Sequence, residues 1–350
     1  MFFFSKSNSV LGIDIGTSYV KAVQLKKGSP SPILESYGVV NVIYPTESVE
    51  RFDAVKQTAE ILKALYAKAG FTTKKAVISI PSNVAFVSIL TVPKMSDKEL
   101  QKSIEYQAKK YIPLPIMDVN LGWQILEDPS SNKAGSLEAA RVKVLLTAVP
   151  KNVISNYARL IELAGFEPLA MEPESLSLIR SLVDTQDRSG LLIVDVGAKS
   201  TSLSLVEKGY LWSTRHLTVG GDTITATIAK NMGLSFDRAD QMKRSSDFGS
   251  NVVSPVTQVT QNIIEMIKSE IQQLVRIAEN QGKKISKIIL TGGGSKISGF
   301  EQDFLSLGLK VEKGNPLKSV AYNKSVESKL LQLHPQLAVS MGLALRFTRG

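Results

Sequence analysis

An aspartate, a glycine and two hydroxyl residues follow one another at the end of an apolar segment near the start of the chain. Residues 10–25 read VLGIDIGTSYVKAVQL, which predicts a buried strand, a tight turn and a second strand running back beside the first. Backbone amides and hydroxyl groups donate hydrogen bonds to phosphate oxygens, and a carboxylate can hold a hydrated cation. The turn is therefore a candidate phosphate and metal site, made of Asp14, Gly16, Thr17, Ser18 and Lys21.

A second stretch repeats this plan. Residues 190–206 read GLLIVDVGAKSTSLSLV, in which Asp195 and Gly197 correspond to Asp14 and Gly16. One such stretch alone is also typical of an ordinary hairpin whose glycine only relieves a turn. The repetition favours a shared function, and it adds a second candidate set: Asp195, Gly197, Ala198, Lys199 and Ser200.

A third glycine-rich loop follows another predicted strand. Residues 288–300 read IILTGGGSKISGF, and consecutive glycines let the backbone approach a ligand closely before a helix begins. The candidate residues here are Gly292, Gly293, Gly294 and Lys296.

Two hairpin phosphate loops followed by a strand, three glycines and a helix resemble the actin-like ATPase superfamily, which includes sugar kinases, heat-shock chaperones, actin and the cell-division protein FtsA. The resemblance implies an α/β fold of two RNase H-like domains around a nucleotide cleft. It also implies ATP with Mg²⁺ in that cleft, with Asp14 and Asp195 acting through metal-bound water.

The resemblance marks three further places. In chaperone and division relatives, a helix that begins Glu-Pro carries a carboxylate facing the γ-phosphate, and Glu172 in LAMEPESLSLIRSLV matches it. A helix N-terminal charge without a catalytic role explains Glu172 equally well. Gly220 and Gly221 match a glycine pair that passes close to the nucleotide. Lys243 in SFDRADQMKRS matches a lysine that lies along ribose or purine, although a solvated basic helix face explains it too.

Composition excludes several other classes of site. The 350 residues include no cysteine and two histidines, which argues against disulfides, thiolate metal sites and a Ser-His-Asp triad. The formal charge of +10 comes with dispersed basic pairs, so we interpret it as solvated ends and expect no nucleic-acid partner. No apolar run approaches the roughly 20 residues that span a bilayer. We therefore expect a cytoplasmic protein.

Periodicity and breaker residues divide the chain into four parts. Strands at residues 10–42, a helix at 53–69 and a strand at 76–80 are followed by the break Pro81-Ser82-Asn83. The predicted parts are a first actin-like domain (residues 1–83 with 166–188 and 337–350), an inserted α/β subdomain (84–165), a second actin-like domain (189–220 with 286–336) and a mainly helical subdomain (221–285).

The inserted subdomain carries the most discriminating resemblance. Ser96 and Glu99 form a capping-box pattern that opens a helix through Tyr111, and Pro113 and Pro115 follow it. Together with a strand containing Trp123, residues 92–126 resemble the PilM family of type IV pilus assembly proteins. The chain also ends after a predicted helix at residues 336–346, without the amphipathic membrane tail of FtsA relatives, which favours the PilM family.

This resemblance implies a cytoplasmic adaptor at the periphery of the inner membrane, with at most slow ATPase activity. Its expected partner is the short cytoplasmic N-terminal tail of a PilN-like bitopic membrane protein, bound in a nucleotide-sensitive way between the inserted subdomain and the core. Other pilus platform proteins and self-association are further expected contacts, and the membrane is reached only indirectly. The alternatives are a filament-forming division or cytoskeletal ATPase and, with no recognisable acceptor site, a small-molecule kinase.

Overall fold

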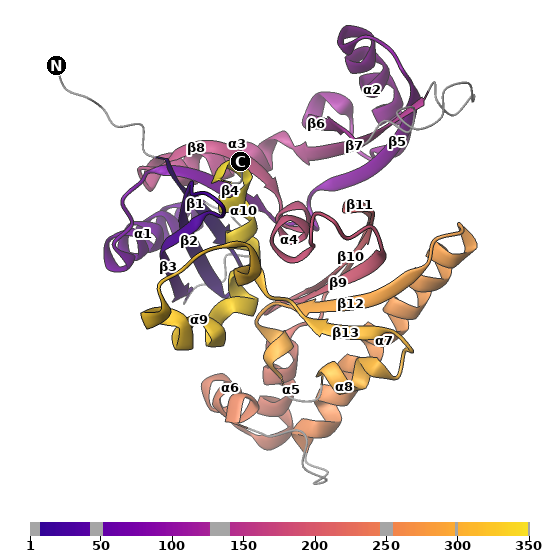
Figure 1. Ribbon diagram of the computed structural model, residues 1–350. Helices are drawn as coiled ribbons and strands as arrows, with labels where there is room; N and C mark the ends of the chain where they lie inside the picture. Colours follow the sequence, from indigo (N-terminus) through magenta and orange to yellow (C-terminus); the bar gives the residue numbers. More distant parts are fainter. Residues whose placement is uncertain (1–7, 43–51, 127–140, 246–254, 298–299, 349–350) are drawn as a thin grey trace, which may run out of the picture.

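The computed structural model describes residues 8–42, 52–126, 141–245, 255–297 and 300–348, and it contains two five-stranded sheets and one smaller sheet (Figure 1). The first sheet has the strand order β3-β2-β1-β4-β8. Antiparallel pairing of the first three strands fits the short connections between them, whereas β4 and β8 run parallel to β1. The strands are β1 (Ser9–Ile15), β2 (Tyr19–Lys26), β3 (Ile33–Asn41), β4 (Lys75–Ile80) and β8 (Glu167–Pro173).

Helices cover both faces of this sheet. Leu11, Ile13 and Ile15 alternate toward one face, where they join the core formed with α1 (Phe52–Ala69) and α3 (Lys151–Leu163). The opposite face of β1 packs against α10 (Ala338–Thr348), which also packs against α4 (Glu174–Leu182).

The second sheet repeats the first in strand order. Its order is β11-β10-β9-β12-β13, which corresponds strand for strand to the order of the first sheet. The strands are β9 (Gly190–Val196), β10 (Thr201–Glu207), β11 (Tyr210–Leu217), β12 (Ile285–Thr291) and β13 (Lys310–Lys313). The repeated motifs at Asp14 and Asp195 therefore stand at the ends of equivalent strands.

A helical layer covers the second sheet. The longest helix, α7 (Pro255–Asn280), buries Ile267, Ile271 and Leu274 in a core that includes both phenylalanines of α8 (Phe300–Leu305). The other helices on this side are α5 (Gly221–Met232) and α6 (Phe236–Ser245), and α9 (Glu327–Leu333) precedes α10. Among the described helices, none combines the length and the apolar character needed to span a membrane.

The inserted segment forms the third sheet, of order β5-β7-β6. Ser96 and Glu99 make the expected capping box at the start of α2 (Asp97–Tyr111), whose Leu100, Ile104 and Ala108 are buried against one sheet face. Leu145 on the other face clusters with Leu176 of α4 and Leu211 of β11. The strands are β5 (Phe86–Pro93), β6 (Val119–Ile125) and β7 (Arg141–Pro150).

The elements follow the sequence expectations with differences at their ends. The chain after the three glycines forms a short 3₁₀ turn at Gly294–Lys296 before α8, so the predicted helix does not begin there directly. A 3₁₀ turn at His334–Leu337 likewise precedes α10. The polar residues 128–135, whose composition predicts a linker, lie outside the described residues.

Candidate functional site

A cavity of about 2130 Å³ opens between the two large sheets and is lined by residues from both. It brings together the two equivalent aspartates, both hairpin turns and the glycine bend after β12. The sequence-predicted residues that line it are Asp14, Gly16, Thr17, Ser18, Lys21, Asp195, Gly197, Ala198, Lys199, Ser200, Gly221, Lys243, Gly292, Gly293, Gly294 and Lys296.

Asp14 is fixed on both carboxylate oxygens. Lys21 Nζ donates to Asp14 Oδ2 at 2.7 Å, and Ser79 Oγ donates to Asp14 Oδ1 at 3.0 Å. Burial disfavours the charge on Lys21, but the Asp14 carboxylate outweighs this effect, with help from Asp195 and Glu174, and the pKa of Lys21 lies above its ordinary value. Lys21 therefore stays cationic beside the cavity.

Carboxylates outnumber this lysine in the cavity wall. Burial raises the pKa of Glu174 to about 8, and the negative charges of Asp14 and Asp195 reinforce the rise. Burial also raises the pKa of Asp195 to about 6, with Lys21 opposing the rise and Asp14 adding to it. The negative charge around Asp14, Asp195 and Glu174 therefore favours binding of a cation or a proton.

The two turns repeat one hydrogen bond. Gly16 N–H donates to Tyr19 O at 3.0 Å, and Gly197 N–H donates to Ser200 O at 2.9 Å. In both turns a Cβ on the glycine would lie 2.9 Å from that same carbonyl oxygen. Glycine is thus required at both positions by close backbone contact, which the sequence motif alone could not establish.

Gly292 and Gly220 are required for reasons that differ from those at the two turns. Gly292 has φ +86°, and a Cβ there would lie 2.3 Å from Asp195 Oδ1, so the bend holds the backbone directly against the carboxylate. Gly220 is not among the cavity-lining residues. Its missing side chain instead makes room for the second turn, because a Cβ would lie 2.5 Å from Ala198 O.

Lys243 lines the far side of the cavity within a polar network. Its Nζ donates to Gly221 O at 3.0 Å and to Thr225 Oγ1 at 2.6 Å, and it pairs with Asp240 at 2.7 Å. Phe236, which is 47% exposed, lines the cavity from the same helix.

Two side-chain contacts cross the cavity from one large sheet to the helices of the other. Ser18 Oγ donates to Asp222 Oδ2 at 3.1 Å, and Arg244 donates to Tyr19 Oη at 2.8 Å. Arg244 is also held by Asp240 at 2.7 Å. These contacts join the first hairpin to the start of α5 and to the last turn of α6.

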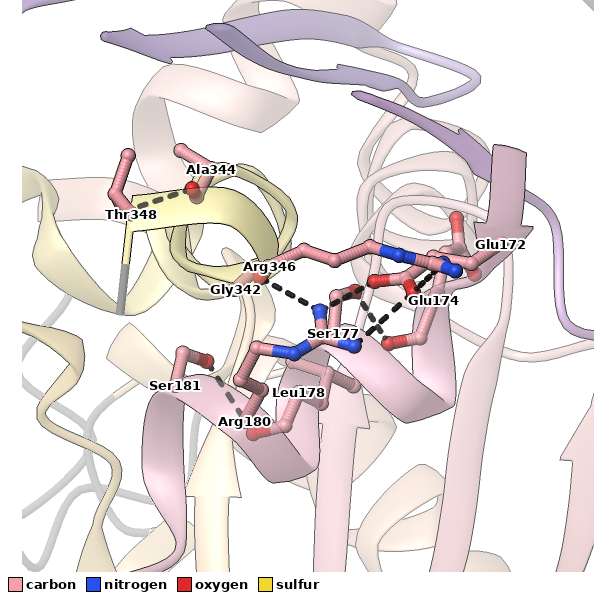
Figure 2. Close-up of polar contacts among 10 residues, drawn as sticks. All are labelled: Glu172, Glu174, Ser177, Leu178, Arg180, Ser181, Gly342, Ala344, Arg346 and Thr348. Carbon is pink, nitrogen blue, oxygen red and sulfur yellow. Dashed lines mark hydrogen bonds and ion pairs between the residues drawn. The ribbon is translucent and has the colours of Figure 1, made fainter. Parts of the chain in front are cut away.

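Glu172 does not line the cavity, and the geometry differs here from the sequence expectation. Figure 2 shows its carboxylate between Arg180 and Arg346, at 2.5 Å from an Nη1 atom of each. Glu172 lies in β8 on the sheet face that α10 covers, because strand side chains alternate and its register partner Ser79 also faces that side. The carboxylate that reaches the cavity belongs to Glu174, in the first turn of α4.

Several lining residues were missed by the sequence reasoning. Ser82 N–H donates to Glu174 Oε2 at 3.3 Å, and Ser82 Oγ accepts from Ser175 N–H at 3.1 Å. Tyr157 of α3 and His216 of β11 also line this end of the cavity. The break Pro81-Ser82-Asn83 was the only signal for this group, and it indicated a domain boundary rather than a site.

The donor set suits a hydrated Mg²⁺ more than a protein-enclosed metal. Across the described residues, no three His, Cys, Asp or Glu side chains gather closely enough to hold a metal ion by themselves. Mg²⁺ keeps several waters and is usually held by one or two carboxylates together with substrate phosphates. Asp14 and Asp195, whose surroundings carry surplus negative charge, fit that role.

Comparison with known proteins places this architecture in a family. A family model described as the type IV pilus assembly protein PilM matches residues 12–348. The chain belongs to the PilM family. Among curated proteins, this PilM-family chain is 23% identical to the cell division protein FtsA of Bacillus subtilis (strain 168) over 354 residues, covering 87% of the chain and 78% of FtsA.

Solved structures agree on the fold. A PilM-PilN type IV pilus biogenesis complex matches with a TM-score of 0.84 and 24% identity, covering 97% of this PilM-family chain and 99% of the other. The ethanolamine utilization protein EutJ of Carboxydothermus hydrogenoformans has a TM-score of 0.58 and 17% identity, covering 96% and 89%. MreB 5 of Spiroplasma citri bound to AMPPNP has a TM-score of 0.53 and 12% identity, covering 96% and 95%. The expected actin-like ATPase fold is confirmed.

Proposed function

We propose that this PilM-family chain is an ATP-binding adaptor of the type IV pilus inner-membrane assembly platform. One observation carries the nucleotide part of the proposal: the two aspartate-ended hairpins and the triple-glycine bend line a single cavity. Backbone amides and hydroxyls of the two turns would bind the β- and γ-phosphates, as such turns do for anions. Asp14 and Asp195 would hold hydrated Mg²⁺, which neutralises phosphate charge when bound.

The other end of the cavity would take the adenosine. Lys243 and Phe236 are among the residues that line the cavity, as are Gly293 and Gly294. Exposed aromatic faces stack on bases, and a lysine there can reach the ribose hydroxyls. We assign the adenine to the Phe236 side and the ribose to Lys243.

Hydrolysis would be slow at most, and Glu174 is the residue that could position a water. Its carboxylate lines the cavity and accepts from Ser82 N–H. A carboxyl group with a pKa of about 8 is mostly protonated near neutral pH, so it is an ineffective water-orienting base until a cation lowers its pKa.

The proposed partner is the short cytoplasmic N-terminal tail of a PilN-like membrane protein. The matching solved structure is a PilM-PilN complex, which supports this choice of partner. We place the tail at the junction of the inserted subdomain with the core. A partner of this kind would put the chain at the cytoplasmic side of the inner membrane, and other platform proteins could then reach it there.

Helix α4 offers a physical route from nucleotide to partner. Its first turn presents Glu174 to the cavity, and its Leu176 and Ile179 pack in the junction cluster with Val87 and Leu145 of the inserted sheet. Ser82, which bonds the start of α4, immediately precedes the inserted segment. A shift of α4 on ATP binding would therefore change the junction, and the tail would bind the two states with different affinity.

The test is calorimetric titration of ATP with Mg²⁺, and then of a synthetic PilN-type N-terminal peptide with and without ATP. Wild type should bind ATP, and Asp14→Ala should lose most of that affinity. The matched control is Asp53→Ala, an exposed acid of α1. Equal ATP binding by Asp14→Ala would refute the nucleotide site. Equal peptide affinity with and without ATP would refute the coupling.

A further inference from the structure

The outer side of the inserted subdomain carries a second hollow, far from the cavity between the large sheets. A groove of about 770 Å³ runs between α2 and the turn at residues 114–117. Figure 1 shows α2 on the side of its sheet that faces away from α4 and β11. We call this hollow the α2 groove; its lining residues are Lys102, Glu105, Tyr106, Lys109, Leu114, Pro115, Ile116 and Met117.

Helical spacing explains why α2 has two different faces. Leu100, Ile104 and Ala108 are buried in the subdomain core. Lys102, Tyr106 and Lys109 follow one another at intervals of four and three residues, so they share the opposite face. The two prolines after Tyr111 end the helix and turn the chain back along that face.

The groove exposes large apolar side chains to solvent. Tyr106 is 63% exposed and Met117 76% exposed, and Leu114 beside them is 43% exposed. Tyr111, Trp123 and Ile125 of the same subdomain are exposed as well. Isolated exposed apolar residues are ordinary, but a contiguous group around a hollow indicates a binding surface.

The charge at the edge of the groove selects the kind of partner. Lys102 and Lys109 flank Tyr106, and among the described residues neither lysine has an ion pair with a carboxylate. Glu105 is the single acid of the lining, and Gln101 donates to it at 3.4 Å. The edge is therefore net positive and unneutralised, which is complementary to an acidic ligand.

The concave shape of the α2 groove favours an acidic protein segment over an acidic membrane as its ligand. A bilayer contact requires apolar side chains that project from a convex surface into lipid. Here the apolar side chains line a hollow, in the way that pockets accept one or two anchor side chains of a bound segment. We propose that the α2 groove binds a short acidic segment of a partner protein, with an apolar anchor between Tyr106 and Met117 and acidic residues on Lys102 and Lys109.

This partner would differ from the tail proposed at the junction, because the two surfaces lie on opposite faces of the inserted sheet. The chain could then hold two partners at once, one on each side of the subdomain. The proposal uses no nucleotide, so it stands or falls separately from the proposed function.

An array of synthetic 12-residue peptides, each with a Leu-Phe pair flanked by acidic, neutral or basic residues, tests the proposal with the full chain. Wild type should retain acidic peptides. The double variant Lys102→Glu/Lys109→Glu should bind them about tenfold more weakly and should bind the basic set instead. Met117→Ser should weaken binding to the acidic set without a change of charge preference.

The matched control is Lys151→Glu/Lys284→Glu, which makes the same change of net charge at exposed lysines outside the groove and should behave as wild type. Thermal unfolding checks that every variant folds, and the reversed preference for basic peptides is a gain that misfolding cannot produce. Retention of no peptide, or a charge preference unchanged in the reversed variant, would overturn the proposal. Binding to phosphatidylglycerol vesicles in place of acidic peptides would also overturn it, in favour of a membrane.

Discussion

Two glutamates separated by one residue have opposite surroundings where β8 ends and α4 begins. Glu172 is 3% exposed and pairs with Arg180 and Arg346, whereas Glu174 faces the cavity. Arg180 Nη1 also donates to Gly342 O at 2.8 Å (Figure 2). Glu172 therefore ties β8, α4 and α10 together, and Glu174 is the carboxylate available to a ligand.

This difference gives the first prediction. Glu172→Gln should lower the free energy of unfolding by about 2 kcal/mol, because two arginines lose a buried charged partner, and should leave ATP binding intact. Glu174→Gln should instead keep or raise stability and slow any ATP hydrolysis. Denaturant unfolding and phosphate release measure the two effects, with exposed Glu162→Gln as control. A loss of hydrolysis in Glu172→Gln with unchanged stability would reverse the assignment.

Asp187, in the connection from α4 to β9, allows a prediction about pH. Burial opposes its ionisation, but hydrogen bonds from Lys287 Nζ at 2.6 Å and from Ser189 hold its pKa at about 2, below the ordinary 3.8. The unfolded chain binds the proton more readily, so this stabilisation is complete above about pH 4 and disappears as pH falls toward about 2. Asp187→Asn should thus lower the melting temperature at pH 7 and have a much smaller effect near pH 2, where about half of the native carboxyl is protonated. An equal effect at both pH values would contradict it.

The glutamate pair also shows what the sequence could not predict. Asp14, Asp195 and the glycines were predictable because each is set by its own strand and turn. Which of Glu172 and Glu174 reaches the cavity depends on Arg346, 174 residues away, and on where β8 ends. The local sequence pattern shows neither the pairing with Arg346 nor the residue at which β8 ends. Phe236 and Ser82 were missed for the same reason, since their place in the cavity follows from packing between distant segments.

Among the elements, α10 packs very closely against the backbones of α4 and β1. A Cβ on Gly342 would lie 1.9 Å from Ser177 O of α4, and a Cβ on Gly12 of β1 would lie 1.9 Å from Ser340 O of α10. Both distances are far shorter than contact, so the helix lies directly on the backbone of its two neighbours. The repeated hairpins and several helices could be predicted from motif and periodicity, but this close approach could not.

We expect Gly342→Ala to lower the free energy of unfolding by about 3 kcal/mol, because α10 or α4 must move to admit the methyl group. Gly122→Ala is the control, since a Cβ there meets nothing within 4 Å. Chemical denaturation of both variants measures the difference. Equal stability of Gly342→Ala and Gly122→Ala would show that α10 and α4 can move apart at little energetic cost.

On the scale of the whole molecule, the two large sheets share a cavity that side-chain hydrogen bonds cross. Ser18 with Asp222, and Tyr19 with Arg244, are the side-chain contacts described above between the first hairpin and the opposite helices. A net hydrogen bond contributes about 1 kcal/mol, so the two together bias the closed arrangement by about 2 kcal/mol, or roughly thirtyfold.

Ser18→Ala/Tyr19→Phe should therefore widen the distance distribution between the halves. The chain has no cysteine, so spin labels can be placed at Lys63→Cys of α1 and Lys230→Cys of α5 without further changes. Electron–electron resonance should give a narrow distribution for the labelled parent and a broader one for the double variant. Tyr106→Phe, on the inserted subdomain, should leave it narrow. Identical distributions would mean that other contacts hold the cavity closed.

The position of α10 also constrains the order in which the protein can be made. Residues 338–348 complete the face of β1 that Gly12 exposes, and they supply Arg346 to Glu172. A growing polypeptide on the ribosome therefore leaves this face of β1 incomplete until the helix emerges some 320 residues later. During that interval the backbone near Asp14 lacks its support, and we expect nascent chains stopped before Ala338 to depend on chaperones and to retain no nucleotide.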